Sequence, residues 1–296
     1  MVAPGILLVD KPGGLTSHDV VARTRKAFGT RKIGHAGTLD PMATGLLVLG
    51  IEGATRLLTY VVGADKTYVA TIRLGQATGT DDAEGENTRA ADAADVDAVA
   101  GEQIRAGIAA LTGEISQVPS AVSAIKVDGR RAYDLVRAGE QVELKARVVT
   151  VSRFDVMDER RGDGLIDLDV VVDCSSGTYI RALARDLGDA LGIGGHLTAL
   201  RRTRIGPFEV AGAVDIDSLA EAETLTPAAA ASTIMQPLEV SADDARDLRH
   251  GKRLGDQAVR LEGALAAAID PEGGLVGIVQ KRGGDLKSVM NMPEAR

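Results

Sequence analysis

The sequence predicts an α+β fold from three patterns. Runs with strand periodicity recur along the chain, as at 66–74, where Tyr68 and every second residue up to Leu74 form one apolar face. Helical spacing is clearest at 178–191, where apolar residues recur every three or four positions and Gly192 follows as a stop. The composition, 45% hydrophobic and 26% charged over 296 residues, is that of an ordinary globular protein.

The first part of the chain alternates short strands with short helices. Thr16 or Ser17 supplies the oxygen that caps the first helix, and the apolar run after Gly45 is typical of a buried strand. The expected elements are a strand at 6–9, a helix at 19–28, a buried strand at 46–51, a short helix at 54–62, the strand at 66–74, a mobile acidic loop at 75–97 and a helix near 99–111.

The second part contains a pair of strands, the clearest helix and a separate group of strands. The residues RGDG at 161–164 are typical of the turn between the paired strands. The expected elements are a proline- and glycine-containing segment at 117–142, strands at 147–157 and 165–174, the helix at 178–191, a strand at 197–210, an Ala-rich helix and linker at 219–233, and further strands within 234–296. The chain therefore divides into a large domain at 1–233 and a small one at 234–296.

The cysteine and apolar content exclude several classes of protein. Cys174 is the single cysteine, so no intramolecular disulfide forms, which fits a reducing compartment. No clustered set of Cys and His indicates zinc, and no apolar run reaches the ~18 residues of a membrane span. The N-terminus lacks the pattern of a signal peptide. We therefore expect a cytoplasmic protein without a bound metal.

Charge is unevenly distributed along the chain. The formal net charge of −8 argues at first sight against a nucleic-acid partner. Acidic residues concentrate at 81–102, however, whereas basic residues concentrate at 11–32 and at 181–204. A face built from the two basic segments is positive although the whole chain is acidic. Solvated helix faces are the alternative explanation for each of these side chains.

The segment GHAGTLDPMATG at 34–45 places one carboxylate in a glycine-rich loop. Pro41 restricts the backbone of Asp40 to extended or turn geometry, and Gly37 and Gly45 permit close approach of a ligand or another backbone. Loops held by a rigid scaffold are where catalytic groups concentrate. On the residues alone, a plain turn and a catalytic loop both remain open.

The extended motif GHAGTLDPMATGLL resembles the catalytic loop of the TruB family of RNA pseudouridine synthases. The resemblance covers about residues 4–210 strongly and the tail weakly. The loop differs from other members before Leu39 and after Pro41, and neither change removes the carboxylate. The resemblance implies the pseudouridine synthase fold, with a mixed, mainly antiparallel central sheet flanked by helices and loops. It also implies an RNA-binding insertion at about 117–142 and a small β-rich, PUA-like RNA-binding domain at 234–296.

Members of this family isomerise uridine to pseudouridine, and the resemblance implies that reaction at position 55, in the T-arm loop of tRNA. The target base is extruded from the folded RNA before it reacts. The reaction exchanges a C1′–N1 bond for a C1′–C5 bond within one nucleotide, without redox change, so no cofactor is expected. The expected partner is the T stem-loop of tRNA. No membrane is expected, and the chain is expected to be a monomer.

Three residues are expected to carry the chemistry. The resemblance implies that Asp40 is the nucleophile and that Arg181, in CSSGTYIRALARDLG, is the ion-pair partner that keeps it ionised. Tyr68, which follows Lys66 in a KxY pattern, is implied to stack on the target base and to relay a proton. From spacing alone, a solvent-facing Arg181 and a core Tyr68 are the simpler interpretations.

Five further residues are expected to bind or position the RNA. His35 is implied to fill the space left by the extruded base, with a turn histidine as the alternative. Tyr179 and Leu200 are implied to form walls of the pocket. Lys11, in a KPxGxxS motif, is implied to support the loop, and Lys126 to meet a phosphate.

Two other functional classes fit parts of the sequence. A non-catalytic tRNA-binding or RNA-folding protein on the same scaffold explains the basic segments, but binding alone does not require an Asp–Arg–Tyr set. A nucleotide-dependent enzyme fits less well, because neither GxxxxGK[ST] nor GxGxxG occurs.

Overall fold

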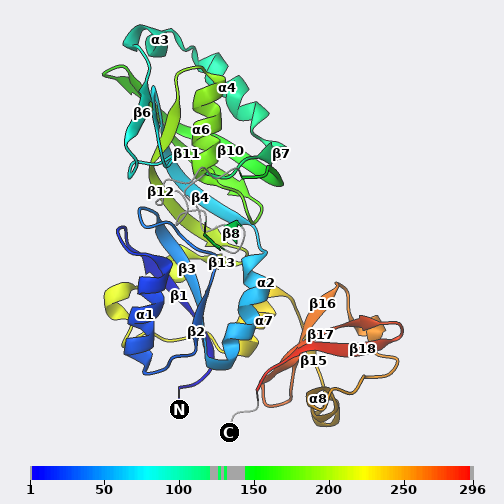
Figure 1. Ribbon diagram of the computed structural model, residues 1–296. Coiled ribbons are helices and arrows are strands. Elements are labelled where there is room, and N and C mark those ends of the chain that lie inside the picture. The colour runs from blue at the N-terminus through cyan, green and yellow to red at the C-terminus, as the bar shows by residue number, and fades with distance from the viewer. Residues whose placement is uncertain (1, 121–125, 128–129, 132–143, 294–296) are drawn as a thin grey trace.

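The computed structural model describes residues 2–120, 126–127, 130–131 and 144–293, with the backbone alone for 126–127 and 130–131. Its main feature is a ten-stranded sheet in the order β14-β1-β3-β12-β4-β11-β10-β7, with β2 beside β3 and β13 beside β12 (Figure 1). The strands of this sheet are β1 (Gly5–Lys11), β2 (Ile33–Ala36), β3 (Thr44–Ile51), β4 (Lys66–Leu74), β7 (Gly113–Gln117), β10 (Arg147–Gly162), β11 (Leu165–Cys174), β12 (Gly195–Ile205), β13 (Phe208–Glu209) and β14 (Val214–Asp215).

Neighbouring strands of this sheet are antiparallel, except that β1 runs parallel to β14 and β3 runs parallel to β12. The sheet is therefore mixed and mainly antiparallel, which confirms the predicted fold class. Two short hairpins lie outside it, formed by β5 (Gln76–Thr78) with β6 (Asn87–Ala90) and by β8 (Lys126–Val127) with β9 (Arg130–Arg131).

The helices cover the sheet in separate groups (Figure 1). In the N-terminal half α1 packs against β1, β2 and β3, whereas α4 and α6 lie together beside β4 and β12. The helices are α1 (Ser17–Phe28), α2 (Leu58–Val62), α3 (Ala93–Ala98), α4 (Gly101–Ala110), α6 (Ile180–Ala190), α7 (Pro227–Ile234) and α8 (Ala242–Arg249), and the 3-10 helices are η1 (Glu52–Leu57), η2 (Val210–Gly212), η3 (Ile216–Ser218) and η4 (Ala258–Arg260).

The ends of α1 are set by local side-chain and backbone signals. Thr16 is the N-cap: its hydroxyl accepts the N–H of Asp19, and the Asp19 carboxylate accepts the N–H of Thr16, which forms a capping box. Gly29 ends the helix in the left-handed conformation, with φ 66°. Val20 and Val21 face the sheet and are buried. This helix is therefore held in a fixed direction relative to the sheet.

A second sheet forms the C-terminal part of the chain (Figure 1). It has the order β15-β16-β17-β18, with strands β15 (Gln236–Glu239), β16 (Leu265–Ile269), β17 (Leu275–Arg282) and β18 (Asp285–Asn291). One apolar cluster joins this sheet to the large one, because it includes Leu57 and Leu58 as well as Ile278 and Met292. The chain therefore has two sheets that share a buried contact.

The structure corrects three of the sequence predictions. The loop expected at 75–97 is the β5–β6 hairpin followed by α3. The helix expected at 54–62 begins as a 3-10 helix at Glu52, and the strand expected at 197–210 ends at Ile205, because Gly206 turns the chain back with φ 51°. The insertion expected at 117–142 lies mostly outside the described residues. Within the described part, no helix is both long and apolar enough to cross a membrane.

Candidate active site

Asp40 lies in the loop between β2 and β3, and α1 holds this loop from one side. The hydroxyl of Ser17, the first residue of α1, donates to the carbonyl of Leu39 at 3.2 Å and accepts the N–H of Leu39 at 2.9 Å. Ser17 is buried, so water does not compete for these bonds. A single side chain thus fixes both backbone groups of the residue before Asp40.

The same loop is held from the other side by β12. Arg202, which is 1% exposed, donates to the carbonyls of Gly37 at 3.0 Å, Thr38 at 3.4 Å and Leu46 at 2.9 Å. Gly45 has φ 98°, and a Cβ at this position would lie 2.2 Å from the carbonyl oxygen of Arg202. Only glycine therefore allows β3 to approach β12 this closely.

Lys11, at the end of β1, holds the Asp40 loop through a backbone carbonyl. Its Nζ donates to the carbonyls of Pro12 at 2.9 Å, Leu15 at 2.6 Å and Pro41 at 3.2 Å. Burial lowers the pKa of Lys11 to about 8, and the Asp40 carboxylate acts in the opposite direction. The side chain is fully buried and all three of its N–H donors are used, so it positions the loop and has none left for RNA.

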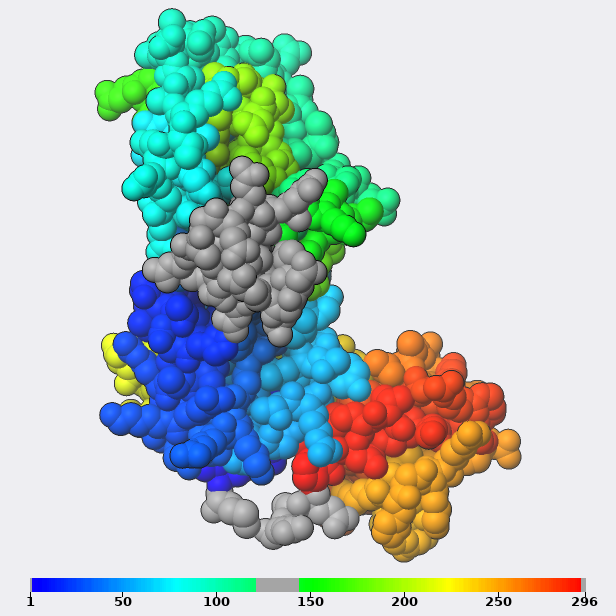
Figure 2. All heavy atoms as spheres, viewed as in Figure 1, coloured from blue at the N-terminus to red at the C-terminus, as the bar shows by residue number. Residues whose placement is uncertain are grey.

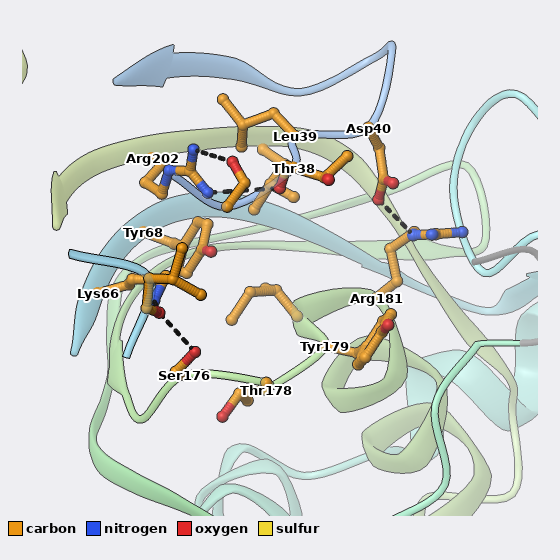
Figure 3. A pocket seen from close by; sticks show the side chains of 15 residues that line it. Thr38, Leu39, Asp40, Lys66, Tyr68, Ser176, Thr178, Tyr179, Arg181 and Arg202 are labelled. Atoms are coloured by element: carbon orange, nitrogen blue, oxygen red, sulfur yellow. Dashed lines mark hydrogen bonds and ion pairs between the residues drawn. The ribbon is translucent and has the colours of Figure 1, made fainter. Parts of the chain in front are cut away.

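A buried arginine connects this loop to the β5–β6 hairpin (Figure 3). Nε of Arg181 lies 3.0 Å from Oδ2 of Asp40, and its Nη1 lies 3.2 Å from Oδ2 of Asp82 and donates to the carbonyl of Thr80 at 2.7 Å. The side chains of Arg181 and Asp82 are 3% and 4% exposed, whereas that of Asp40 is 36% exposed. One guanidinium therefore serves two carboxylates, of which the accessible one is Asp40.

The Asp40–Arg181 pair stands at the edge of a pocket of about 300 Å³ (Figure 3). A cavity at this lower end of the range of ligand sites suits a small ligand such as a single nucleoside. The residues that line it are Gly37, Thr38, Leu39, Asp40, Val62, Lys66, Tyr68, Ser176, Gly177, Thr178, Tyr179, Ile180, Arg181, Leu200 and Arg202.

Tyr68 and Leu200 reach the pocket from the adjacent strands β4 and β12. They are 7% and 8% exposed, so each presents one apolar surface to the cavity and packs elsewhere against the core. Burial raises the pKa of the Tyr68 phenol. The phenol is therefore neutral at pH 7 and retains a proton that it can donate.

Tyr179 precedes α6 and is fixed through its backbone. Its N–H donates to Oε1 of Gln117 at 2.8 Å, and its carbonyl accepts from Nε2 of the same side chain at 3.1 Å. The guanidinium carbon of Arg147 lies 6.0 Å from the centroid of the Tyr179 ring. The ring itself lines the pocket, so the amide of Gln117 orients a pocket wall.

Lys66 lines the pocket two residues before Tyr68. Its Nζ donates to the carbonyls of Val62 at 3.1 Å and Ala64 at 2.6 Å, and burial lowers its pKa to about 8. The hydroxyl of Ser176 donates to the same Val62 carbonyl at 2.8 Å. The site therefore has two buried ammonium groups. That of Lys66 lines the pocket, and that of Lys11 holds the Asp40 loop.

His35 lies on β2, outside the residues that line the pocket. Its ring meets the ring of His18 edge to face, with centroids 5.5 Å apart and planes at 80°. Burial, followed by the charge of His18, lowers the pKa of His35, and its buried Nδ1 has no hydrogen-bond partner among the residues that the structure describes. His35 is therefore a neutral ring beside the Asp40 loop.

The structure brings most of the predicted site residues together. Asp40, Arg181, Tyr68, Tyr179 and Leu200 share one pocket. Lys11 lies beneath the loop and His35 beside it. Lys126 belongs to β8, and its side chain is outside the described part of the structure.

Two residues that hold the site in place, Asp82 behind Arg181 and Arg202 in the pocket wall, were missed by the sequence analysis. Asp82 was hidden in an acidic segment that we expected to be a solvated loop, and no local pattern marks it as the buried one. Arg202 had a usable signal, because it follows Leu200 by two residues and so lies on the same face of a strand. Among the described residues, no group of three or more His, Cys, Asp or Glu side chains has the arrangement of a metal site.

Family models of the pseudouridine synthases match nearly the whole chain. The TruB family pseudouridylate synthase N-terminal domain matches residues 25–180, the tRNA pseudouridylate synthase B C-terminal domain matches 181–242, and the tRNA pseudouridine synthase II C-terminal domain matches 235–293. The fold and the family models together define the class of the chain as a pseudouridine synthase.

Individual relatives narrow the class. A protein of Leifsonia xyli subsp. xyli (strain CTCB07) named tRNA pseudouridine synthase B is 60% identical and aligns with 99% of this chain and 98% of that protein. A protein of Rhodococcus jostii (strain RHA1) with the same name is 56% identical over 98% of this chain and 94% of that protein. The chain belongs to the TruB family of pseudouridine synthases.

Solved structures show the same fold. A chain of an H/ACA RNP bound to a substrate RNA containing 2'-deoxyuridine has a TM-score of 0.71 and 25% identity, and the match covers 99% of this chain and 86% of that one. A chain of a Cbf5-Nop10-Gar1 complex has a TM-score of 0.68 and 25% identity over 99% of this chain and 84% of that one.

Proposed function

We propose that this protein isomerises uridine to pseudouridine in the T-arm loop of tRNA, at position 55, without a cofactor. The name tRNA pseudouridine synthase B, carried by relatives that align with nearly the full chain, supports tRNA as the substrate. The observation that carries the proposal is the accessible Asp40 carboxylate, held 3.0 Å from a buried Arg181 at the edge of a nucleoside-sized pocket.

Asp40 acts as the nucleophile in this proposal. The Asp40 carboxylate attacks C1′ of the ribose as the C1′–N1 bond breaks and the uracil leaves as an anion. The uracil turns, and its C5 displaces the carboxylate from C1′, which forms the C1′–C5 bond and frees Asp40. Loss of the C5 proton and gain of a proton at N1 complete the isomerisation. Arg181 favours the ionised form of Asp40, because an adjacent guanidinium stabilises a carboxylate.

Tyr68, Leu200 and Tyr179 hold the uracil in the pocket. Stacking of a base on an aromatic ring contributes about 1–3 kcal/mol. The ring of Tyr68 lines the pocket and is available for such stacking (Figure 3). The Tyr68 phenol lines the same pocket and is proposed to relay the C5 proton by accepting it while it passes its own proton on. The apolar side chain of Leu200, on the same face of the neighbouring strand, also lines the pocket and helps to exclude water.

His35 compensates for base extrusion in this proposal. Removing a base from the stack costs a few kcal/mol, and a planar side chain in the vacated space offsets part of that cost. His35 is suited to this position because it lies on the strand that leads into the Asp40 loop and its ring is neutral. The RNA is then recognised mostly by its shape and its phosphates.

We also propose that residues 1–233 form the catalytic domain and residues 234–296 a PUA-type RNA-binding domain. A separate four-stranded sheet and a separate family model for the C-terminal residues support this division. The insertion at 117–142, which falls mostly outside the described residues, is proposed to lie against the RNA, with Lys126 near a phosphate.

The alternative is an RNA-binding protein that does no chemistry. Asp40→Asn separates the two, because it retains the size of the side chain and removes the charged nucleophile. We expect this variant to bind unmodified tRNA with an affinity near that of the wild type and to form no pseudouridine, mapped at single-nucleotide resolution. Asp217→Asn, at an exposed surface position, is the matched control and should be fully active. Full activity of Asp40→Asn would contradict the proposal.

A further inference from the structure

The exposed side of α1 carries basic residues that the pocket does not use. Helical periodicity places His18, Ala22, Arg25 and Lys26 along one stripe, and Arg31 follows just after the helix. All five residues are exposed. We call them the α1 ridge. It contains three positively charged side chains, those of Arg25, Lys26 and Arg31. The exposed carboxylate nearest to it on the helix is Asp19, which accepts hydrogen bonds from the backbone N–H and the hydroxyl of Thr16.

The cations of the ridge are not neutralised by the protein. Within the described part of the chain, no ion pair involves Arg25, Lys26 or Arg31. The nearby carboxylate of Glu52 is already engaged, since it lies 3.4 Å from Nζ of Lys32 and also accepts a hydrogen bond from a threonine hydroxyl. The positive charge of the ridge therefore faces solvent.

The second basic segment of the sequence behaves differently. Arg185 pairs with Asp81 at 3.1 Å, Arg201 with Asp10 at 2.6 Å, and a third arginine of this segment with Asp65 at 2.8 Å. We expected one positive face built from both basic segments. Because these arginines of the second segment are paired with carboxylates, only the N-terminal segment contributes such a face.

The ridge ends in an open hollow. Residues Ala22, Arg25, Lys26, Gly29, Thr30 and Arg31 line it. Gly29 ends the helix in the left-handed conformation, and a Cβ at this position would meet nothing within 4 Å, so the hollow is open to solvent. A concave surface bordered by three unpaired cations suits a phosphate group.

The other end of the ridge meets the active-site loop. The ring of His18 contacts the ring of His35, and the neighbouring Ser17 is hydrogen-bonded to Leu39. Lys26 follows His18 by eight positions along the helix, a distance of about 12 Å.

In Figure 2 the N-terminal segment, coloured blue, forms a broad part of this face, at the opposite end of the body from the cyan segment that contains the acidic residues. A strand leaving the pocket past His35 therefore reaches a positive surface.

We infer that the α1 ridge binds the phosphate backbone of the RNA strand that carries the target uridine, outside the pocket. This inference rests on the proposed function, because it takes the RNA from the Asp40 pocket along α1. Lysine and arginine contacts to phosphates supply affinity and orientation without reading sequence. Such a surface fits an enzyme that recognises the shape of one stem-loop.

The test compares two single charge reversals. Arg31→Glu lies in the ridge, and Arg105→Glu lies on α4, where the arginine is also exposed and outside every ion pair of the described residues. Both change the net charge by the same amount, so general electrostatic repulsion of RNA is matched. The Kd for unmodified tRNA is measured by filter binding at several salt concentrations on the order of 0.1 M. The single-turnover rate is measured at saturating RNA.

We expect Arg31→Glu to raise the Kd about tenfold and to reduce the slope of log K against log salt by about 1, the value for one lost phosphate contact. Arg105→Glu should change the Kd less than about twofold. The rate of Arg105→Glu at saturating RNA should match that of the wild type. Both variants should keep the wild-type thermal unfolding midpoint, which shows that both are folded. Lys26→Glu added to Arg31→Glu should lower the slope further.

Equal Kd values for Arg31→Glu and Arg105→Glu, or a Kd of Arg31→Glu equal to that of the wild type, would overturn the inference. Because filter binding detects the complex whether or not the uridine is converted, its failure is distinct from failure of the proposed function. A wild-type protein that binds tRNA through the ridge and forms no pseudouridine would contradict the proposed function alone.

Discussion

Arg181 holds two carboxylates that differ in their exposure to water. The Asp82 side chain is almost fully buried, so its interaction with the guanidinium is weakly screened, whereas Asp40 is partly exposed. Asp82 therefore fixes the arginine, and the arginine in turn fixes the accessible carboxylate. Removing one partner of a buried ion pair destabilises by about 3–5 kcal/mol, because a charge is left without its counter-charge.

The first prediction concerns this buried partner. Asp82→Asn should lower the single-turnover rate of pseudouridine formation about 100-fold, because the guanidinium loses its fixed position and a small misplacement of a catalytic group has an effect of that size. The Kd for tRNA should change less than about twofold. Asp81→Asn is the control, since Asp81 precedes Asp82 and pairs with Arg185 instead. Equal rates in the two variants would show that Asp82 does not position Arg181.

The second prediction concerns the pH dependence of the loop support. Below pH 8 the Lys11 ammonium has three N–H donors for three carbonyls, and above its pKa of about 8 the neutral amine has two. We expect the single-turnover rate to fall between pH 7 and 9 as the carbonyl of Pro41 loses its donor. If the decline persists in Lys66→Met, it belongs to Lys11; a level rate up to pH 9.5 contradicts the prediction.

The free energy of unfolding should rise as Lys11 loses its proton, whereas the reaction rate should fall. The folded-state pKa of Lys11 is below the unfolded value of 10.5, so the folded protein releases this proton first as the pH rises. The unfolded state then binds more protons, and the free energy of unfolding contributed by this group increases between pH 8 and 10.5. Loss of activity in this window therefore does not require unfolding.

At the scale of elements, the geometry of the Asp40 loop depends on one short stretch where two strands pair, which we call the β3–β12 crossing. β3 and β12 run parallel where Thr44 pairs with Arg201 and Gly45 pairs with Arg202. From this crossing the guanidinium of Arg202 reaches back to the loop carbonyls. The close approach at Gly45 thus sets both the sheet and the backbone on which Asp40 is carried.

The third prediction tests this crossing. Gly45→Ala should lower the free energy of unfolding by about 3–4 kcal/mol, because the added Cβ overlaps the Arg202 carbonyl and the backbone has φ 98°. Gly14→Ala is the matched control: its φ of 81° is similar, but a Cβ there meets nothing within 4 Å. It should lose only about 1–2 kcal/mol, from backbone strain. Equal losses by urea unfolding would show that the overlap is relieved by movement of the strands.

Elements with a strong local period were predicted well from the sequence. The strand at 66–74 and the helix α6 follow their apolar spacing, and α1 starts at its capping box. The hairpin at 76–90 was missed because its strands are only three and four residues long, β6 is fully exposed and the connection between them is acidic, so no local apolar period marks them. Asp82 was missed for the same reason, since its burial depends on Arg181, about a hundred residues later.

The site shows the same division between local and distant causes. Asp40 was recognisable from a contiguous motif, whereas Arg202 acts through carbonyls that β12 approaches only in the folded sheet. Motif matching found residues that line the pocket, and it also found Lys11, which holds carbonyls of the loop. It did not find Arg202, because the contacts of that side chain depend on strand order, which the spacing of apolar residues does not encode.

At the scale of the whole molecule, the two sheets are connected through shared apolar packing. Met292, at the end of the C-terminal sheet, reaches η1 of the large domain, where its Cε would be 3.3 Å from a Cβ at Gly53. Leu57 and Leu58 belong to the same cluster. A shared cluster of buried side chains makes the stability of each part depend on the other. The C-terminal sheet is therefore part of the folding unit.

The fourth prediction follows from this shared cluster. The wild type should unfold in one calorimetric transition, and Met292→Asp, which buries an unpaired carboxylate, should split it into two or lower its midpoint by about 6–10 °C, equivalent to about 3 kcal/mol. Val289→Asp, three residues earlier on β18 and 43% exposed, is the control and should shift the midpoint by less than about 2 °C. Two separate transitions in the wild type, unchanged by Met292→Asp, would show that the sheets are only tethered and that the large domain does not need the small one to fold.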